Sequence, residues 1–547
     1  MTSPITAPLI APYIQSQLGH SHSITNWPTS TNPPISSTHH VLSPPSPVST
    51  TSQEYAANNH NFSSSDSARL QDDRSSASHA HSSKMIGADV AMAQDDETLV
   101  NLYYSNFHAA HPFLVPRTMF ASQNYPDYLV KMVQFVGSHY TASSLSNSLR
   151  EAIGLTLAQI QEHDRSFHIV QARLLFSIVL HARNEIRESV SVLAEAVTMA
   201  LEIGLQGEEF CSRYGPATSI TAESVRRTWW ELYVIDGFTA ALQRRTGSLC
   251  HDANPDMPLP CEENLYMDGS VLSTPPTVAE FDTRIFAEEE YPFSSFYFRI
   301  EAVRNLLRVL AISGDYEVEE EQVQAINTTL AAWAHHLPAD KASALNEFGE
   351  VDEMLFQAHM FVHYTIIYLH FPRSHLVATV PATSEIIRQR HLVPFSTQSM
   401  HGLKAIEAAK QLANLAALHA STMKRTPFFV FAVVFGAIVQ LSAFSQQALA
   451  SREHFRDRIS LIMGILKSSA STWTFSGVVL RKLRKIAAEV LDVKLKEQHN
   501  GAIASQEFHA SLPHQDILPA FTDMDWLTFF DTGFLSGMIA PPSNARF

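Results

Sequence analysis

The sequence predicts an all-α protein, in which a large helical array follows a disordered N-terminal tail. Two observations on the chain support this prediction. From Asp95 onward, apolar residues recur at spacings of three and four, which is the periodicity of an amphipathic helix. No stretch shows sustained alternation of apolar and polar residues, which would indicate strands with one buried face. The fold class therefore follows from the period of the hydrophobic pattern.

The first 94 residues have a different composition from the rest of the chain. Segments such as "STNPPISSTHHVLSPPSPVSTTSQ" are rich in Ser, Thr, Pro, Asn and His and contain few large apolar side chains. Such a segment cannot bury enough apolar surface to offset the entropy lost on ordering. Residues 1–94 are therefore predicted to be disordered, and their histidines are assigned to low-complexity sequence rather than to a metal site.

Helices are predicted over residues 95–496. The first begins at Asp95 in "DDETLVNLYYSNFHAAHP" and ends before Pro112. The segments "FHIVQARLLFSIVLHARN" and "EIRESVSVLAEAVTMALEIGL" predict two amphipathic helices, the second of which ends at Gly204. Further helices are expected at about 296–312, 318–336, 351–371, 399–420, 427–450, 454–468 and 475–496, with long loops around 248–292 and 372–398.

One predicted helix is apolar enough to raise the question of a membrane. Residues 427–451 carry no charge, and a run of this length can span a bilayer. However, Gln440, Gln446 and Gln447 lie within it, and no Trp or Tyr belt flanks it. A helix that is hydrophobic all round is also what the centre of a large helical body requires. The run is therefore assigned to the core, and no membrane association is expected.

Charge and cysteine content limit the possible functions. The formal net charge of −16 gives the chain as a whole no electrostatic attraction to nucleic acid. Cys211, Cys250 and Cys261 are too few and too scattered for a disulfide framework or a multi-cysteine metal cluster, which favours a reducing compartment. The start of the chain, "MTSPITAPLIAPYIQSQLGH", shows no secretory signal.

No motif in the sequence predicts an enzyme. The chain contains no phosphate loop, no GxGxxG after a strand, no HExxH and no GxSxG elbow. His359, His363 and His370 share one helical face in "HMFVHYTIIYLH", and imidazoles one turn apart can bind zinc. The hydrolytic version needs a glutamate beside the first histidine, where Met360 stands here. Core histidines are the favoured interpretation, and no catalytic residue, metal ligand or cofactor is predicted.

The stretch "RRTWWELYVIDGFTAALQRRTG", residues 226–247, is predicted to be one interior helix, because most of its circumference is apolar. A buried Asp236 needs a cation or a donor, and Arg226 lies about three turns away, too far to serve. We therefore expect the partner of Asp236 on another helix. Arg244 and Arg245 are placed in the last turn, where cations suit the helix dipole. A ligand pocket with Arg and Asp inside is the alternative.

Four landmarks in order resemble a known family. The segments "VRRTWWELYVIDGFTAALQRR", "HDANPDMPLPCEE", "LAAWAHHLP" and "IIYLHFPRS" are similar to the middle homology region of fungal transcription factors, a helical regulatory domain downstream of a binuclear zinc cluster. The resemblance covers residues 95–496. It implies signature positions, expected to be structural rather than catalytic, at Arg226, Arg227, Trp229, Trp230, Asp236, His370, Pro372 and Ser374.

The zinc cluster of that family is not recognisable in this sequence. The cluster needs six closely spaced cysteines, and the first cysteine here is Cys211. We therefore expect the chain to act without its own zinc-cluster DNA reader, either because the sequence is truncated or because a partner protein binds DNA. Direct contact of this chain with DNA is in question for the same reason.

The C-terminal residues 497–547 form an acidic-aromatic tail. No Lys or Arg occurs from Glu497 to Ala545, and acidic and aromatic side chains alternate near the end. Such mixtures keep hydrophobic anchors soluble until a coactivator groove receives them. The predicted activation segment contains Phe521, Asp523, Asp525, Trp526, Phe529 and Phe530. Docking of this tail on the helical body is the alternative. The basic "RKLRK", residues 481–485, is assigned to a solvated helix face rather than to a nuclear import signal.

These observations together predict a nuclear transcriptional regulator of a fungus without enzymatic activity. The resemblance implies pathway-specific control, of a specialised-metabolite gene cluster or of nutrient use. It implies a DNA-binding partner or coactivator, and it leaves room for a small-molecule effector and for a homo-oligomer. The alternative is a helical small-molecule sensor or enzyme that uses Arg226 with Asp236 or His359 with His363.

Overall fold

The computed structural model describes residues 96–141, 145–160, 165–253, 255–287, 292–313, 320–346, 348–376, 395–418, 424–446 and 452–504. These residues are helices and connecting loops, with no strand among them and one isolated bridge between Leu345 and Val351. The all-α prediction is confirmed. All of them belong to one compact unit, residues 75–547, while a second unit covers residues 1–74. The predicted N-terminal tail, 1–94, lies outside the described residues. Of the predicted C-terminal tail, 497–547, residues 497–504 are helical, so that boundary is wrong, and residues 505–547 lie outside the described residues.

The N-terminal part of the body begins with helical residues 96–106, which continue into a short 3-10 turn, His108–Ala110. Next come α2 (Arg117–Phe120), α3 (Asp127–Ser138) and α4 (Leu145–Gln159). Helix α3 crosses the first helix so closely that a Cβ at Gly137 would lie 1.9 Å from the carbonyl oxygen of Leu99. Glycine at this position therefore permits the close approach of the two backbones.

Helices α5 (Phe167–Ala182) and α6 (Ile186–Ile203) form the predicted pair and pack on each other. The side chain of Ser166 caps the first by accepting a hydrogen bond from the backbone N–H of His168. The second ends where Gly204 adopts a φ of 78°, as the sequence predicts. Both helix boundaries thus follow from local capping chemistry.

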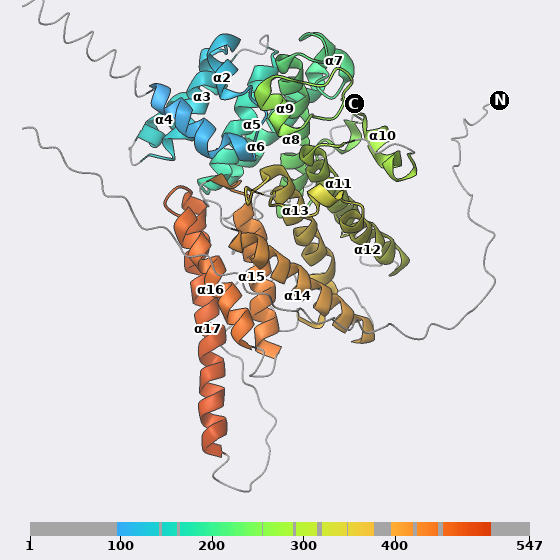
Figure 1. Ribbon diagram of the computed structural model, residues 1–547. Helices are drawn as coiled ribbons and strands as arrows, with labels where there is room; N and C mark the ends of the chain where they lie inside the picture. Colours follow the sequence, from blue (N-terminus) through green and yellow to red (C-terminus); the bar gives the residue numbers. More distant parts are fainter. Residues whose placement is uncertain are drawn as a thin grey trace, which may run out of the picture. The chain divides into compact units, whose positions relative to one another are not determined.

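The long helix α8 (Ile220–Leu242) follows the short α7 (Glu208–Ser212), and Ser219 caps its N-terminus. The segment 248–292, predicted to be a long loop, contains short helices α9 (Glu263–Asp268) and α10 (Val278–Thr283). These helices have one or two turns, too short for a periodic pattern to register. Figure 1 shows α8 within the cluster of α5, α6 and α9, above the C-terminal helices.

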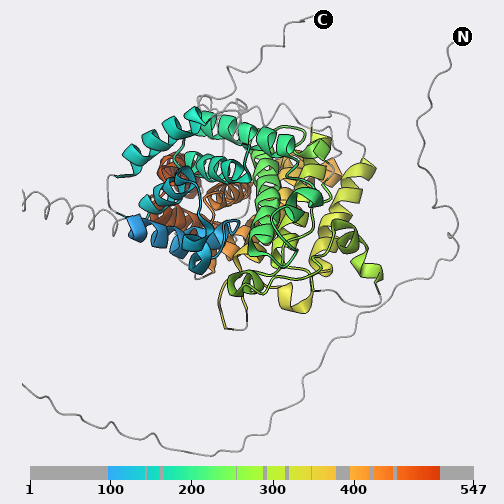
Figure 2. The ribbon, with the colours of Figure 1, turned by 90° about the horizontal axis from the view of Figure 1, so that it is seen from above.

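The C-terminal helices confirm the remaining periodic predictions to within a few residues, except that the last helix, α17 (Thr474–Ala504), continues past its predicted end at residue 496. Helix α11 packs between α8 and α13, and α13 to α17 pack on one another in sequence order (Figure 2). Their bounds are α11 (Ser295–Ser313), α12 (Glu320–His335), α13 (Glu353–His370), α14 (Phe395–Ala417), α15 (Phe429–Gln446), α16 (Arg452–Ser469) and α17 (Thr474–Ala504).

Helix α15 is the apolar run examined above for a membrane span. It lies buried against α14, α16 and α17, and side chains such as Val433, Ile438 and Val439 are 1% exposed or less. Among the described residues, no helix combines the length and apolarity that crossing a membrane requires. The apolar surface of α15 is thus buried by neighbouring helices.

Candidate functional site

Helix α8 occupies the interior, as the sequence predicts. Trp229 is fully buried and Trp230 is 1% exposed, and the indole Nε1 of Trp230 donates to the carbonyl oxygen of Pro258 at 2.9 Å. The placement of Arg244 and Arg245 in its last turn is wrong, since the helix ends at Leu242. Arg244 adopts a φ of 55°, and this left-handed residue turns the chain out of the helix.

The first turns of α8 contain a buried carboxylate between two guanidinium groups. Glu223 Oε2 accepts from Nε of Arg226 at 2.8 Å, and Glu223 Oε1 accepts from Nε of Arg227 at 2.9 Å. All three side chains are 1% exposed or less. Burial alone would raise the pKa of Glu223, but the two guanidinium groups hold it below its ordinary value. The helix thus pairs its own buried charges at spacings of three and four residues.

Arg227 connects α8 to two other segments. Its Nη1 donates to the carbonyl oxygen of Pro112 at 3.1 Å, and its Nη2 donates to that of Cys261 at 3.0 Å. It also pairs with Glu263 at the start of α9, and its guanidinium lies 3.9 Å from the ring centre of Tyr266. This single side chain therefore positions the segment before α2 and the loop that leads to α9.

A second buried carboxylate, Glu231, lies two turns further along α8. Its Oε1 is 2.8 Å from Nδ1 of His111, and its Oε2 accepts from Nη2 of Arg299 on α11. All three side chains are fully buried. Burial lowers the pKa of His111, while Arg299 and His111 hold the pKa of Glu231 below its ordinary value against the effect of burial. Glu231 thus joins the N-terminal segment to α11 through α8.

Asp236 has a partner in a place the sequence analysis did not predict. Its Oδ1 accepts from Nη2 of Arg245 at 3.0 Å, and its Oδ2 accepts from the backbone N–H of Cys250 at 2.8 Å. The expectation of a partner on another helix is therefore wrong. The left-handed turn at Arg244 returns the chain along the end of α8, which brings Arg245 to the carboxylate.

The structure does not bring Arg226 and Asp236 together. Besides Glu223, Arg226 contacts the carbonyl oxygen of Ala217 at 2.8 Å and the thiol sulfur of Cys211 at 3.7 Å. Asp236 pairs at the opposite end of α8. Each buried charge of the helix is thus matched by a nearby protein group, which is how buried charges are tolerated. The arrangement holds chain segments in place and presents no shared Arg/Asp pocket.

The second part of the predicted signature forms the turn after α13. His370 is buried, with Nδ1 2.6 Å from Nδ1 of His401 and Nε2 3.2 Å from Oδ1 of Asn327. Burial lowers the pKa of His370 to about 3. Pro372 lies in the 3-10 turn Phe371–Arg373, and Ser374 Oγ donates to the carbonyl oxygen of Phe371 at 2.7 Å. These residues end α13 and attach it to α14.

His359 and His363 lie one turn apart on α13 with ring centres 6.4 Å apart, and His359 meets the edge of Trp333. His370 faces His401 instead of this pair. Among the described residues, no group of three or more His, Cys, Asp or Glu side chains could hold a metal ion. Burial lowers the pKa of His363 to about 4, so its ring is neutral at physiological pH.

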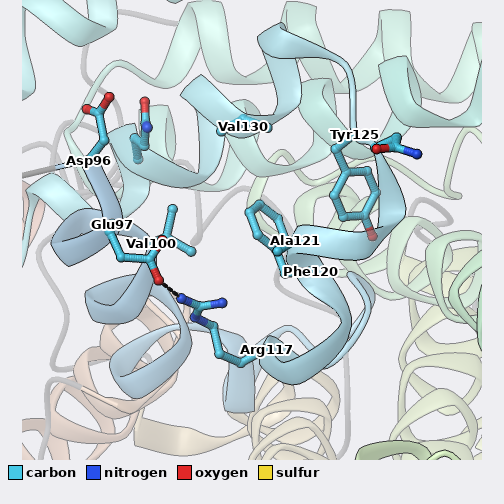
Figure 3. A pocket seen from close by; sticks show the side chains of 10 residues that line it. Asp96, Glu97, Val100, Arg117, Phe120, Ala121, Tyr125 and Val130 are labelled. Atoms are coloured by element: carbon cyan, nitrogen blue, oxygen red, sulfur yellow. Dashed lines mark hydrogen bonds and ion pairs between the residues drawn. The ribbon is translucent and has the colours of Figure 1, made fainter. Parts of the chain in front are cut away.

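A pocket of about 370 Å³ lies away from all these residues, between the first helix and α2 and α3 (Figure 3). Asp96, Glu97, Phe120 and Tyr125 contribute to its wall. Arg117 at its edge pairs with Glu97 and donates to Oδ1 of Asn101 at 2.7 Å. Arg117 and Glu97 are thus already engaged with each other, and none of the predicted signature residues lines the pocket.

The sequence analysis missed several members of the α8 network. Glu223 could have been found, because it precedes Arg226 and Arg227 by three and four residues on a predicted helix. Glu231, His111 and Arg299 could not, because their contacts join residues 120 and 68 positions apart. Only the packing of the first helix and α11 on α8 creates that cluster.

The buried histidines make stability depend on pH. Burial lowers the pKa of His181, which packs against Phe428, Phe431 and Phe475, to about 3. At a pH below about 6.5, the pKa of histidine in the unfolded chain, His181 is protonated in the unfolded state but stays neutral in the folded state. His181 therefore stabilises fully above about pH 6.5, and stability falls toward pH 3 by up to about 1.4 kcal/mol per pH unit.

We expect His181→Leu to reduce the pH dependence of the free energy of unfolding between pH 6.5 and 4.5 by up to about 1.4 kcal/mol per pH unit. His336→Leu, at an exposed position, is the matched control and should leave the slope unchanged. Urea unfolding at several pH values measures both. An unaltered slope in His181→Leu would show that this imidazole is not the buried neutral group described here.

Comparison with known proteins adds two findings. Residues 100–335 match the fungal specific transcription factor domain. The chain is also 30% identical, over 417 residues, to the C6 finger domain transcription factor iacK of Pestalotiopsis fici, an alignment that covers 74% of this chain and 61% of the relative. The match thus spans about three fifths of that relative's length. No solved structure matches the chain.

Proposed function

We propose that the protein is a nuclear transcriptional regulator of a fungus, because residues 100–335 match the fungal specific transcription factor domain. The family match is the observation that carries this proposal, and the similarity to a C6 finger domain transcription factor supports it. We assign residues 95–496 to the regulatory domain, preceded by the low-complexity segment 1–94 and followed by the tail 497–547. The resemblance to this family suggests that the protein controls the genes of one pathway, either for a specialised metabolite or for nutrient use.

The geometry of α8 supports a regulatory rather than a catalytic role. Arg226, Arg227 and Asp236 are engaged by protein groups, and Trp229 and Trp230 are packed in the core. A catalytic carboxylate or imidazole would need access to a substrate, which these buried pairs do not offer. We propose that the signature residues hold the domain together, and that the protein is not an enzyme.

We propose that the helical domain acts with a separate DNA reader, supplied either by a longer form of this chain or by a partner protein. The three cysteines of the chain are free and buried in the helical body, and a binuclear zinc cluster needs six thiolates close together. The charge of −16 also gives the chain as a whole no general affinity for DNA. A DNA-binding partner or a coactivator would supply the contact with chromatin, and a homo-oligomer or a small-molecule effector is compatible with this arrangement.

Deletion of the gene, combined with transcript profiling and chromatin occupancy of a tagged copy, tests the proposed function. We expect a coherent set of transcripts to change, and the tagged protein to occupy their promoters. Complementation with the intact gene is the control. Unchanged transcripts under conditions in which the protein accumulates, or a protein confined to the cytoplasm, would favour the small-molecule sensor or enzyme.

The tail allows a direct test of activation. We expect residues 511–537, fused to an unrelated DNA-binding domain, to activate a reporter, since activation segments work without their native fold. Replacing Trp526, Phe529 and Phe530 by Ala should abolish activation, because the aromatic rings supply the apolar area that a coactivator groove buries. Asp523→Asn with Asp525→Asn should weaken it less. A silent fusion, together with a lower melting temperature on tail removal, would identify a structural closure.

A further inference from the structure

Helix α17 presents an exposed basic face in an otherwise acidic protein. Arg481, Arg484 and Lys485 are exposed and lie at spacings of three and four, so they share one face. Leu483 and Ile486, on the opposite face, are 2% exposed or less and belong to the hydrophobic core. The orientation of the basic face toward solvent is therefore fixed by the packing of α17 on its neighbours.

Basic residues outnumber carboxylates in this part of the sequence. Within the described part of the chain, no ion pair engages Arg481, Arg484 or Lys485, whereas many arginines elsewhere are paired. Residues 458–488 contain no carboxylate, and the next one on α17 is Glu489, four residues after Lys485, although the whole chain has 54 acidic and 38 basic residues. Such an unbalanced cationic face is a site for an acidic partner.

The sequence that follows α17 supplies such a partner. From Glu497 to Ala545 there is no Lys or Arg, and Asp516, Asp523, Asp525 and Asp531 lie among aromatic residues. We propose that residues 516–531 of the same chain bind the basic face of α17 at Arg481, Arg484 and Lys485. The carboxylates would pair with the three cations, and the exposed Leu461 of α16, the helix packed beside α17, offers apolar area to the aromatic side chains.

The length of the chain permits this contact. Helix α17 continues from Lys485 to Ala504, which at 1.5 Å per residue is about 29 Å. Figure 1 shows α17 extending well past α16. Residues 505–515 connect its end to the proposed segment, and these 11 residues can span at most about 36 Å when extended, which exceeds the required distance. Because the segment is tethered to α17, its concentration at the basic face is set by the linker rather than by the protein concentration, which favours binding through weak ion pairs.

The contact would cover the proposed activation segment. Trp526, Phe529 and Phe530 cannot enter a coactivator groove while their segment lies on α17. This regulatory consequence rests on the proposed function of the tail, whereas the contact itself does not. An acidic competitor or a change in ionic conditions would release the segment.

A photo-crosslinking residue in place of Phe529, in the full-length protein, tests the contact. We expect crosslinks within one chain, mapped by mass spectrometry to residues 477–489 of α17, with a yield independent of protein concentration. The variant Arg481→Glu with Arg484→Glu and Lys485→Glu should lower the yield about tenfold, the equivalent of 1.4 kcal/mol, through loss of the ion pairs. Raising the salt concentration from 0.05 to 0.5 M should also lower it.

The matched control is Lys131→Glu with Arg187→Glu and Lys424→Glu, which makes the same charge change at exposed sites on other elements and should keep the crosslink. Crosslinks to other parts of the body, crosslinks only between chains, or none at all would overturn the proposal. A gel-shift result would also overturn it. If the wild-type chain retards a DNA duplex, the α17 variant does not, and no tail crosslink forms, then the basic face binds nucleic acid instead of the tail.

The outcome is separable from that of the reporter fusion. If residues 511–537 fail to activate but crosslink to α17, the contact stands and the activation claim fails. If they activate in the fusion but do not crosslink to α17, the activation segment stands and its contact with α17 does not exist. If both succeed, the α17 variant should raise reporter output from the full-length chain.

Discussion

Replacing Glu223 by Ala is expected to destabilise the protein by about 3–5 kcal/mol, the usual cost of breaking a buried ion pair by removing one partner. The change leaves the guanidinium groups of Arg226 and Arg227 buried without the carboxylate between them. It also removes the acceptor for the backbone N–H of Cys261, 2.9 Å from Glu223 Oε1. Urea unfolding followed by circular dichroism measures the loss, with the m-value as a check that the transition is unchanged.

Two further variants make this prediction decisive. Glu209→Ala removes the carboxylate of an exposed i,i+4 pair with Arg213 and should leave the urea midpoint nearly unchanged. Glu223→Gln keeps the shape and part of the hydrogen bonding, so it should fall between the wild type and Glu223→Ala, and it provides a measurable protein if the alanine variant does not fold. A Glu223→Ala protein as stable as the wild type would mean that the two arginines are solvated.

The second large effect is expected from Trp229→Ala, which should destabilise by about 3–5 kcal/mol because it leaves a cavity in the core. Trp229 is fully buried, and its Nε1 has no hydrogen-bond partner among the described residues. Trp230 differs, since its Nε1 donates to the carbonyl oxygen of Pro258. Trp230→Phe should therefore lose about 1 kcal/mol of hydrogen-bond stabilisation that Trp229→Phe does not lose.

The control for this series is Phe286→Ala, at a side chain that is 82% exposed, which should change the melting temperature little. Thermal unfolding of all four variants gives the comparison. A Trp229→Ala protein that melts like the wild type but no longer regulates its genes would contradict the structural role. Such a result would instead favour the alternative interpretation of α8, in which the helix lines a ligand pocket and Trp229 belongs to it.

The period of the sequence was enough to locate most of the helices, though not α3 or α4, and to predict the interior position of α8. Periodicity located α5, α6, α8 and the C-terminal helices, because the apolar face of a helix repeats every 3.6 residues whatever it packs against. It did not reveal the short helices between residues 248 and 292, where one or two turns contain too few residues for a period. The pairing of Glu223 with Arg226 and Arg227 was also within reach, since those residues are neighbours on a single helix.

The partners of Glu231 and Asp236 follow from how the chain folds in three dimensions. Arg299 and His111 reach Glu231 only because α11 and the loop after the first helix meet α8 at the same carboxylate, a consequence of topology rather than of local spacing. Asp236 pairs with Arg245 because one residue, Arg244, takes a left-handed conformation that no propensity predicts for arginine. Local hydrogen bonding fixes where helices form, whereas the pairing of buried charges depends on which helices meet, and that depends on the packing of the whole core.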